Sequence, residues 1–178
     1  FGLSGGLERD FGFGYLGLSL SYVDGSISNG DLQAIDGKLV EVAGHWRLRS
    51  GGLHAFARLS GIHVSLESTR TFSGTVDDTD FSYETSGTWS GWALSAMAGA
   101  SYDLEVGKTF TLRPKAVIDY YWLKEGAYEE DGVDAIDLAV SSRDSKALAA
   151  TGTLTASYRF GPKSRDTTPL TVEIEGGW

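Results

Sequence analysis

The side chains best suited to acid–base chemistry are three histidines, His45, His54 and His63. They fall on two predicted strands and on mixed faces of those strands, so the pattern does not bring them together. Neither the HExxH pattern of zinc proteases nor the GxSxG turn of serine hydrolases occurs in the sequence. A hydrolase of this chain would have to depend on His45. We therefore predict no catalytic residues and no enzyme activity.

Two acidic clusters, Asp77 to Asp80 and Glu129 to Gly132, could in principle offer oxygen ligands to Ca²⁺. Neither follows the ligand spacing of an EF-hand loop, and a solvated acidic rim explains them more simply. The glycine pair in Gly12-Phe-Gly14 is followed by no predicted helix, so it is not a phosphate-binding loop. We expect no metal and no cofactor.

Composition excludes further classes of function. The 178 residues carry 15 basic and 24 acidic side chains, a net charge of −9, which disfavours nucleic acid as a partner. Without cysteine there is neither a disulfide scaffold nor a thiolate metal site. The 24 glycines and few prolines suggest closely paired strands. We see no boundary between domains and treat 1–178 as one domain, and a start at Phe1 suggests that a leader or upstream part has been removed.

Alternation of apolar and polar residues is the strongest structural signal. From Trp92 to Leu104, every second position is apolar, and the positions between them are smaller or more polar. The same period recurs along the chain and predicts nine antiparallel strands. Their ranges are about 1–8, 11–23, 38–49, 53–67, 89–104, 109–123, 133–141, 147–160 and 169–178. In the strand that begins at Leu53 the parity changes near Gly61, which predicts a β-bulge there.

The predicted connections alternate between short turns and long loops, apart from 161–168. In an up-and-down sheet, successive connections lie at opposite ends, so the long loops share one end. The three long connections, 24–37, 68–88 and 124–132, each carry a net charge of −3 and together account for the whole net charge. One rim of the sheet should therefore be acidic.

Alternation alone does not say whether the apolar face meets lipid or a second sheet, as in a soluble sandwich. Three features favour lipid: strands longer than ten residues, short turns opposite long loops, and paired aromatic residues. Trp92 and Tyr102 lie on one face about 33 Å apart along the strand, or about 25 Å along the membrane normal at a tilt of about 40°. The longest run without charge, 85–102, is rich in Ser, Gly and Thr and is too polar for a membrane-spanning helix. Because lipid leaves no edge unpaired, the sheet must close into a barrel.

Two sets of residues follow from the alternation. Aromatic residues expected at the lipid boundary are Trp46, Trp92, Tyr102, Phe110, Tyr120, Trp122, Tyr158 and Phe160. Polar residues expected to face a water-filled lumen are Glu41, His45, Arg47, Arg58, Arg113, Lys115, Asp119 and Tyr121. These polar side chains could contact a passing chain or simply pair across strands.

Several segments resemble the translocator β-domain of autotransporters (type V secretion). The segments are Phe110 to Tyr120 with its Pro114, Tyr128 to Leu138, Ser141 to Ser145, the strand that ends Tyr158-Arg-Phe160-Gly161, Pro169 to Trp178, and the Gly-rich stretches Gly5 to Glu8 and Gly12 to Leu18. The resemblance implies an all-β, antiparallel, up-and-down transmembrane barrel of about twelve strands, of which this segment holds about eight or nine. An odd count of nine departs from the even number of bacterial barrels.

The resemblance also implies a function, an environment and partners. The chain would anchor an N-terminal passenger domain in the outer membrane of a Gram-negative bacterium and assist its export, with the acidic loops outside the cell. Its partners would be outer-membrane lipid, its own passenger or a linker helix in the lumen, and the barrel-assembly machinery. The alternative is a self-contained small barrel that acts as an adhesin or a porin-like protein, with Trp178 as its terminal aromatic residue.

Overall fold

The computed structural model describes residues 1–30, 32–133, 135–161 and 170–178. No helix in these ranges is long and apolar enough to cross a membrane. The described chain consists of strands and turns. The strands are β1 (Gly2–Asp10), β2 (Tyr15–Asn29), β3 (Gln33–Ser50), β4 (Leu53–Val76), β5 (Thr79–Tyr102), β6 (Leu104–Val106), β7 (Phe110–Glu125), β8 (Tyr128–Glu129), β9 (Ala139–Val140), β10 (Arg143–Phe160) and β11 (Leu170–Gly177).

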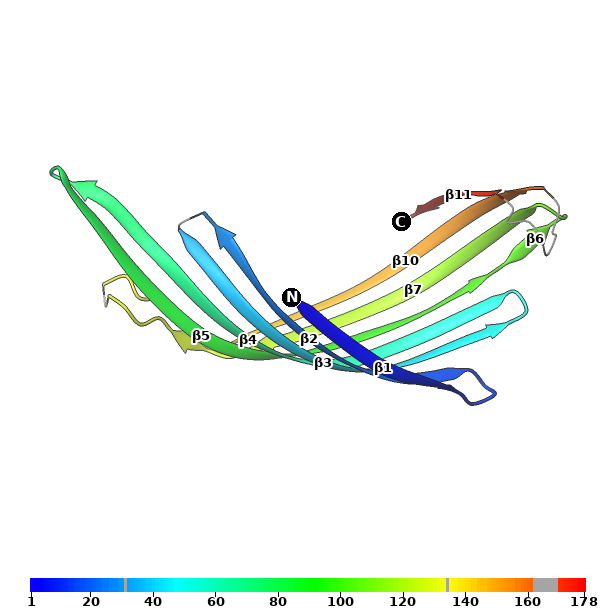
Figure 1. Ribbon diagram of the computed structural model, residues 1–178, viewed down its shortest axis with the longest axis horizontal. Helices are drawn as coiled ribbons and strands as arrows, with labels where there is room; N and C mark the ends of the chain where they lie inside the picture. Colours follow the sequence, from blue (N-terminus) through cyan, green and yellow to red (C-terminus); the bar gives the residue numbers. More distant parts are fainter. Residues whose placement is uncertain (31, 134, 162–169) are drawn as a thin grey trace.

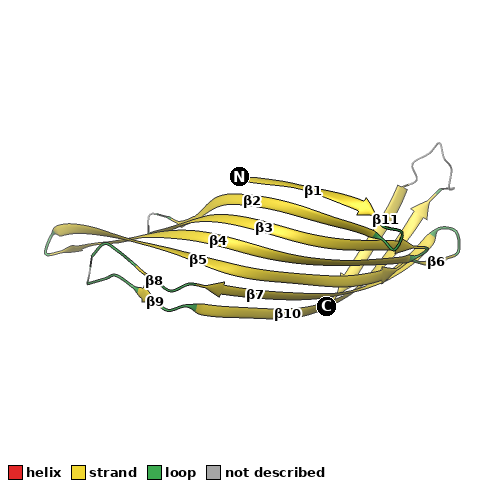
Figure 2. Ribbon diagram, turned by 90° about the horizontal axis from the view of Figure 1, so that it is seen from below, coloured by secondary structure: helices red, strands yellow, loops and turns green. Residues whose placement is uncertain are grey.

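The strands form a single curved layer in which chain order is also spatial order (Figures 1 and 2). The order is β1-β2-β3-β4-β5-β7-β10-β11, and every neighbouring pair is antiparallel. The predicted all-β, antiparallel, up-and-down fold is therefore confirmed. β1 and β11 are the two edges of the layer, and no pairing joins them among the described residues.

Three short strands are continuations of longer ones. β6 pairs with β7 in the same register as β5 does, and only Asp103 interrupts the strand, where its N–H donates to Gly52 O. β8 and β9 continue the β7–β10 pair in an unchanged register. Among the described residues the layer thus has eight crossing strands, which agrees with the predicted eight or nine, although one of the nine predicted ranges is not a crossing strand.

The extra strand is the one predicted at 133–141. Only Ala139–Val140 is a strand, and the segment before it forms the tip of the β7–β10 hairpin. Val133 O accepts from the N–H groups of Ile136 and Asp137, and the Asp137 carboxylate accepts from Val133 N–H. A side chain that satisfies the backbone locally competes with strand pairing, and here the turn prevails. Asp134 lies outside the described residues.

The connections predicted as long loops at 24–37 and 68–88 are mostly strand. β2 and β3 pair as far as Asn29 and Gln33, and β4 and β5 pair as far as Val76 and Thr79. At the second tip, Asp77 and Asp78 have φ of 49° and 61°, the left-handed values of a two-residue type I′ turn. Both faces of a projecting two-stranded ribbon are exposed, so burial does not impose a long alternating pattern, and the prediction ended these strands too early.

The predicted bulge at Gly61 is wrong. The register of β4 on β3 and on β5 runs without interruption from Leu53 to Arg70. Ile62 and Val64 therefore lie on the same face as Arg58, where Val64 packs beside Gly91 of β5. At the other end of the sheet the described connections are short turns at 11–14, 51–52 and 107–109. Short turns were predicted at this end, but Arg9 and Asp10, predicted as the first turn, belong to β1, and most of the short connection predicted at 142–146 belongs to β10. The predicted connection at 161–168 lies outside the described residues apart from Gly161.

Candidate functional site

The register separates the side chains of the sheet into two faces. Ala98 pairs with Ala57 on one side and with Ile118 on the other, and this row defines what we call the apolar face. All eight predicted boundary aromatics share that face: Trp46, Trp92, Tyr102, Phe110, Tyr120, Trp122, Tyr158 and Phe160. The eight predicted polar residues share the opposite, polar face: Glu41, His45, Arg47, Arg58, Arg113, Lys115, Asp119 and Tyr121. That one face meets lipid and the other a lumen stays a prediction.

The distribution of buried residues is the reverse of that in a soluble protein, because large apolar side chains are exposed and small residues are buried. On the apolar face Trp92 is 61% exposed, Ile118 is 54% exposed and Ile174 is 74% exposed. The most deeply buried residues, such as Ser60 and Ala43, are small and lie on the polar face. Soluble monomers rarely expose a contiguous apolar surface of this extent. No second layer of described residues covers the apolar face.

One ion cluster on the polar face joins β1 to β3 near the turn end of the sheet. Glu8 accepts two hydrogen bonds from Arg47, at 2.8 Å from Nε and 2.5 Å from Nη2, and lies 2.9 Å from His45 Nε2. Arg47 also lies over the ring of Tyr15, 4.4 Å from its centroid. Gly17 leaves room for the His45 ring, which a Cβ at that position would meet. Sequence reasoning found His45 and Arg47 but missed Glu8, because its partners are 37 and 39 residues away.

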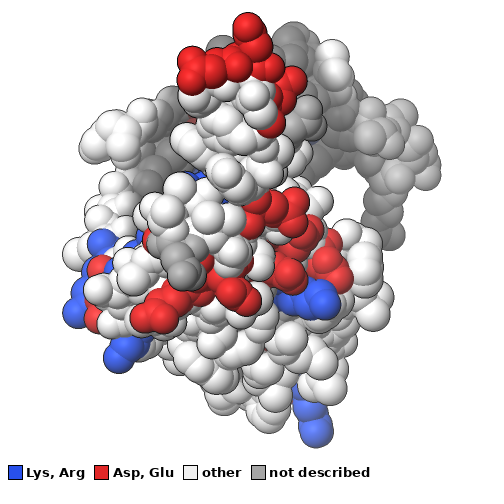
Figure 3. Space-filling view, turned by 90° about the vertical axis from the view of Figure 1, so that its left-hand side faces the viewer, with Lys and Arg blue, Asp and Glu red and all other residues white. Residues whose placement is uncertain are grey.

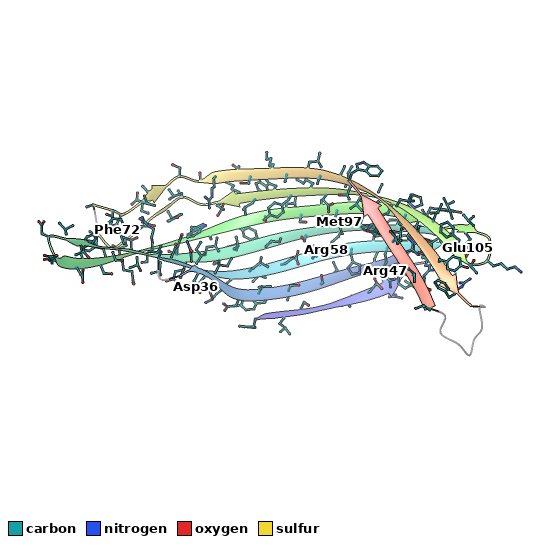
Figure 4. All side chains as sticks on the ribbon, turned by 90° about the horizontal axis from the view of Figure 1, so that it is seen from above. Asp36, Arg47, Arg58, Phe72, Met97 and Glu105 are labelled. Atoms are coloured by element: carbon teal, nitrogen blue, oxygen red, sulfur yellow. The ribbon has the colours of Figure 1, made fainter. Side chains whose placement is uncertain are left out.

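Other pairs on the polar face also cross strands. Glu41 and Arg58 form an ion pair at 2.8 Å between β3 and β4. Asp103 accepts from Arg113 at 2.5 Å and lies 3.2 Å from His54 Nε2. Figure 4 labels Arg58 beside Met97 near the middle of the sheet and Arg47 nearer the turn end. Lys115, Asp119 and Tyr121 share the face, and no ion pair or side-chain hydrogen bond joins them to another described residue.

A denser network lies at the opposite, hairpin end, where the β7–β10 tip contacts the β4–β5 hairpin. Glu130 accepts from Arg70 Nη2 at 2.5 Å, from Thr85 Oγ1 at 3.1 Å and from Leu138 N–H at 3.1 Å. Arg70 also donates to Ile136 O at 2.8 Å. Thr85 is 1% exposed and Glu130 is 9% exposed. Hydrogen bonding from Arg70 is the main reason why the pKa of Glu130 is held below its ordinary value of 4.5.

Backbone and aromatic contacts strengthen this junction. Ser86 and Asp131 exchange two backbone hydrogen bonds, at 3.0 Å and 2.7 Å. Trp89 stacks on Tyr128 with ring centroids 4.4 Å apart and an interplanar angle of 12°. The Trp89 indole donates to Glu125 at 3.1 Å, and Glu125 also accepts from Arg143. These contacts hold the tip of the β7–β10 hairpin against the β4–β5 hairpin.

Acidic side chains gather at the hairpin end, which faces the viewer in Figure 3. Among the described residues, no group of three or more His, Asp or Glu side chains lies close enough to hold a metal ion. The two clusters considered for Ca²⁺ lie on different hairpins. The acidic residues of the first cluster lie at the tip of the β4–β5 hairpin, whereas Glu130 of the second cluster accepts a hydrogen bond from Arg70.

The comparisons with known proteins agree with this geometry. The family described as Autotransporter beta-domain matches residues 1–178, and the chain belongs to that family. The fold is similar to the translocator domain of the autotransporter NalP from Neisseria meningitidis, with a TM-score of 0.73 and 16% identity. That match covers 99% of this chain and 58% of that domain, so the chain spans less than two thirds of its length. The RagAB peptide importer matches with a TM-score of 0.43 and 12% identity, covering 99% of this chain and 29% of that one. No curated protein sequence matches the chain.

Proposed function

We propose that this chain forms most of a transmembrane β-barrel that anchors an N-terminal passenger domain in the outer membrane and assists its export. The observation that carries the proposal is the wide, exposed apolar face backed by a polar face with ion pairs. Contact of such a face with lipid carries no free-energy penalty, whereas its contact with water is unfavourable. Membership of the autotransporter β-domain family adds the export role.

The open edges support a barrel that needs more strands. Lipid excludes unpaired backbone groups, so β1 and β11 require partners in a membrane. A self-contained barrel of eight strands would pair β1 with β11, and the described residues contain no such pair. We infer that about four further strands, on the order of 80–100 residues, complete a barrel of about twelve.

Orientation follows from the two ends of the sheet. Barrels of the bacterial outer membrane have short periplasmic turns and longer extracellular connections. The three described connections at the turn end have two to four residues, and the hairpin end carries the long acidic hairpins. We infer from this that the hairpin end is extracellular. Membership of the family supports the outer membrane of a Gram-negative cell, and we propose that the barrel-assembly machinery inserts the domain there. The polar face lines a lumen occupied by a linker or by the passing chain, and the mechanism involves no covalent chemistry.

Display of a reporter on cells tests the export role. A protease-sensitive reporter joined upstream of Phe1 in the full parent protein should be digested by protease added to intact cells. The same reporter on a parent protein with Ala98→Arg, which places a charge on the apolar face, should remain inside. Protection of the reporter on a fully assembled wild-type barrel would contradict the export role while leaving the membrane barrel intact.

A further inference from the structure

The β4–β5 hairpin projects beyond its neighbours as a free two-stranded ribbon (Figures 1 and 2). On one side the last described backbone hydrogen bond is from Thr71 N–H to Leu32 O, and on the other side it is in the Ser86–Asp131 bridge. Between them, residues 72–83 pair only with each other among the described residues. We call residues 72–83 the aromatic ribbon.

One face of the aromatic ribbon is apolar and uncovered. Phe72 pairs with Tyr83, and Phe81 lies across from Gly74, whose missing side chain leaves room for the ring. The ring centroids are 5.9 Å apart for Phe72 and Phe81 and 5.6 Å apart for Phe81 and Tyr83. Phe72 is 50% exposed and Val76 is 61% exposed. Figure 4 labels Phe72 far out on this hairpin, away from the middle of the sheet.

The negative charge of the aromatic ribbon limits which partners can bind its apolar face. The aromatic ribbon holds Asp77, Asp78 and Asp80 and no Lys or Arg. A second copy of the ribbon or an anionic lipid surface would bring like charges together. A partner with Lys or Arg gains both attraction to the carboxylates and cation–π contact with the rings.

The unpaired edges of the two strands further restrict the chemical class of the partner. Beyond Thr71 and Ser86 the outer backbone groups of both strands have no described partner, and such an edge can add a strand. An extended polypeptide can use the edge and the rings together, whereas a glycan can only stack. We propose that the aromatic ribbon is a docking site outside the cell for an extended, basic polypeptide segment that carries aromatic side chains.

Binding to the full parent protein in a zwitterionic detergent tests the proposal. The probe is a fluorescein-labelled octapeptide of sequence Lys-Phe-Lys-Thr-Lys-Phe-Lys-Thr, and the comparison peptide has Glu in place of Lys. We expect fluorescence anisotropy to report binding of the basic peptide only, with affinity falling as salt rises. Asp77→Asn with Asp78→Asn should weaken binding about tenfold, because Asn keeps the left-handed turn but removes two charges.

Aromatic and control variants complete the design. Phe72→Ser with Phe81→Ser should also weaken binding about tenfold. The matched changes Glu105→Gln and Phe11→Ser, both exposed at the turn end, should change affinity less than twofold. Unchanged binding in the ribbon variants, or equal binding of the Glu peptide, would overturn the proposal. The proposal would also be overturned if a neutral oligosaccharide bound to the protein and this binding were lost only in the Phe72→Ser, Phe81→Ser variant. Reporter export by the same variants should stay normal, so failure here is distinct from failure of the translocator role.

Discussion

Ala98→Arg should prevent stable assembly of the chain in a membrane. Ala98 is exposed in the middle of the apolar face, between Ala57 of β4 and Ile118 of β7. It lies four residues from Tyr102, about 13 Å along the strand, which is too far for the guanidinium to reach the aqueous boundary. Arg at the midplane of a membrane barrel costs about 2–4 kcal/mol, and about 3 kcal/mol lowers the folding equilibrium constant on the order of 150-fold.

Ser101→Arg is the matched control for this prediction. Ser101 is three positions along the same strand, on the polar face, in register with His54 and Lys115. A new cation there meets water and the nearby Asp103, so assembly should be close to normal. The measurement is the folded fraction in the outer membrane by gel mobility with and without heating, together with guanidinium unfolding in lipid vesicles. Equal tolerance of both variants would refute the assignment of the faces.

Three further predictions concern individual contacts. Arg70→Ala leaves the Glu130 carboxylate buried without its main donor, which should cost about 2 kcal/mol locally and speed amide exchange at Ser86 and Asp131 on the order of 30-fold. Because the pKa of Glu130 is depressed in the folded state, this contact contributes fully above the ordinary pKa of 4.5 and is lost progressively as pH falls from there through the lower folded pKa. Amide exchange, corrected for intrinsic rates, should therefore rise in acid, and protection that stays constant with pH would contradict the assignment. Gly99→Ala places a Cβ 2.9 Å from Ala116 O and 2.6 Å from the Phe56 ring, and should lower the free energy of unfolding, measured with guanidinium, by about 1–3 kcal/mol. Gly5→Ala, whose Cβ would have no atom within 4 Å, should leave the free energy of unfolding unchanged.

The two-residue period assigned most strand side chains to the correct face, but it failed after Gly61, where no bulge occurs. Backbone pleating alone sends alternate residues to opposite sides, so Trp92 and Tyr102 share a face whatever lies beside them. The same argument placed Arg58 and Lys115 together on the other face. Identification of the family needed no more than these patterns and a few segments such as Phe110 to Tyr120.

Alternation could not reveal where strands end in water. Beyond the membrane both sides of a ribbon are solvated, so burial does not extend the alternating pattern, and the short alternation within residues 72–83 did not identify them as strand. Pairing there depends on the type I′ turn at Asp77 and Asp78, which sets the register between β4 and β5. At 133–141 a local side-chain bond to the backbone outweighed strand pairing, and periodicity carries no information about that competition.

The amino-acid sequence by itself therefore determined the class of fold, the family and the face of most strand residues, because strand geometry is local. Ile62 and Val64 are exceptions, since the bulge that would have turned them to the apolar face is absent. Only the tertiary structure decided which charges meet. Glu8 with Arg47, Asp103 with Arg113 and Glu130 with Arg70 are joined by register and by contacts between hairpins. A one-residue slip would turn every side chain to the other face, so these partners depend on how distant strands align.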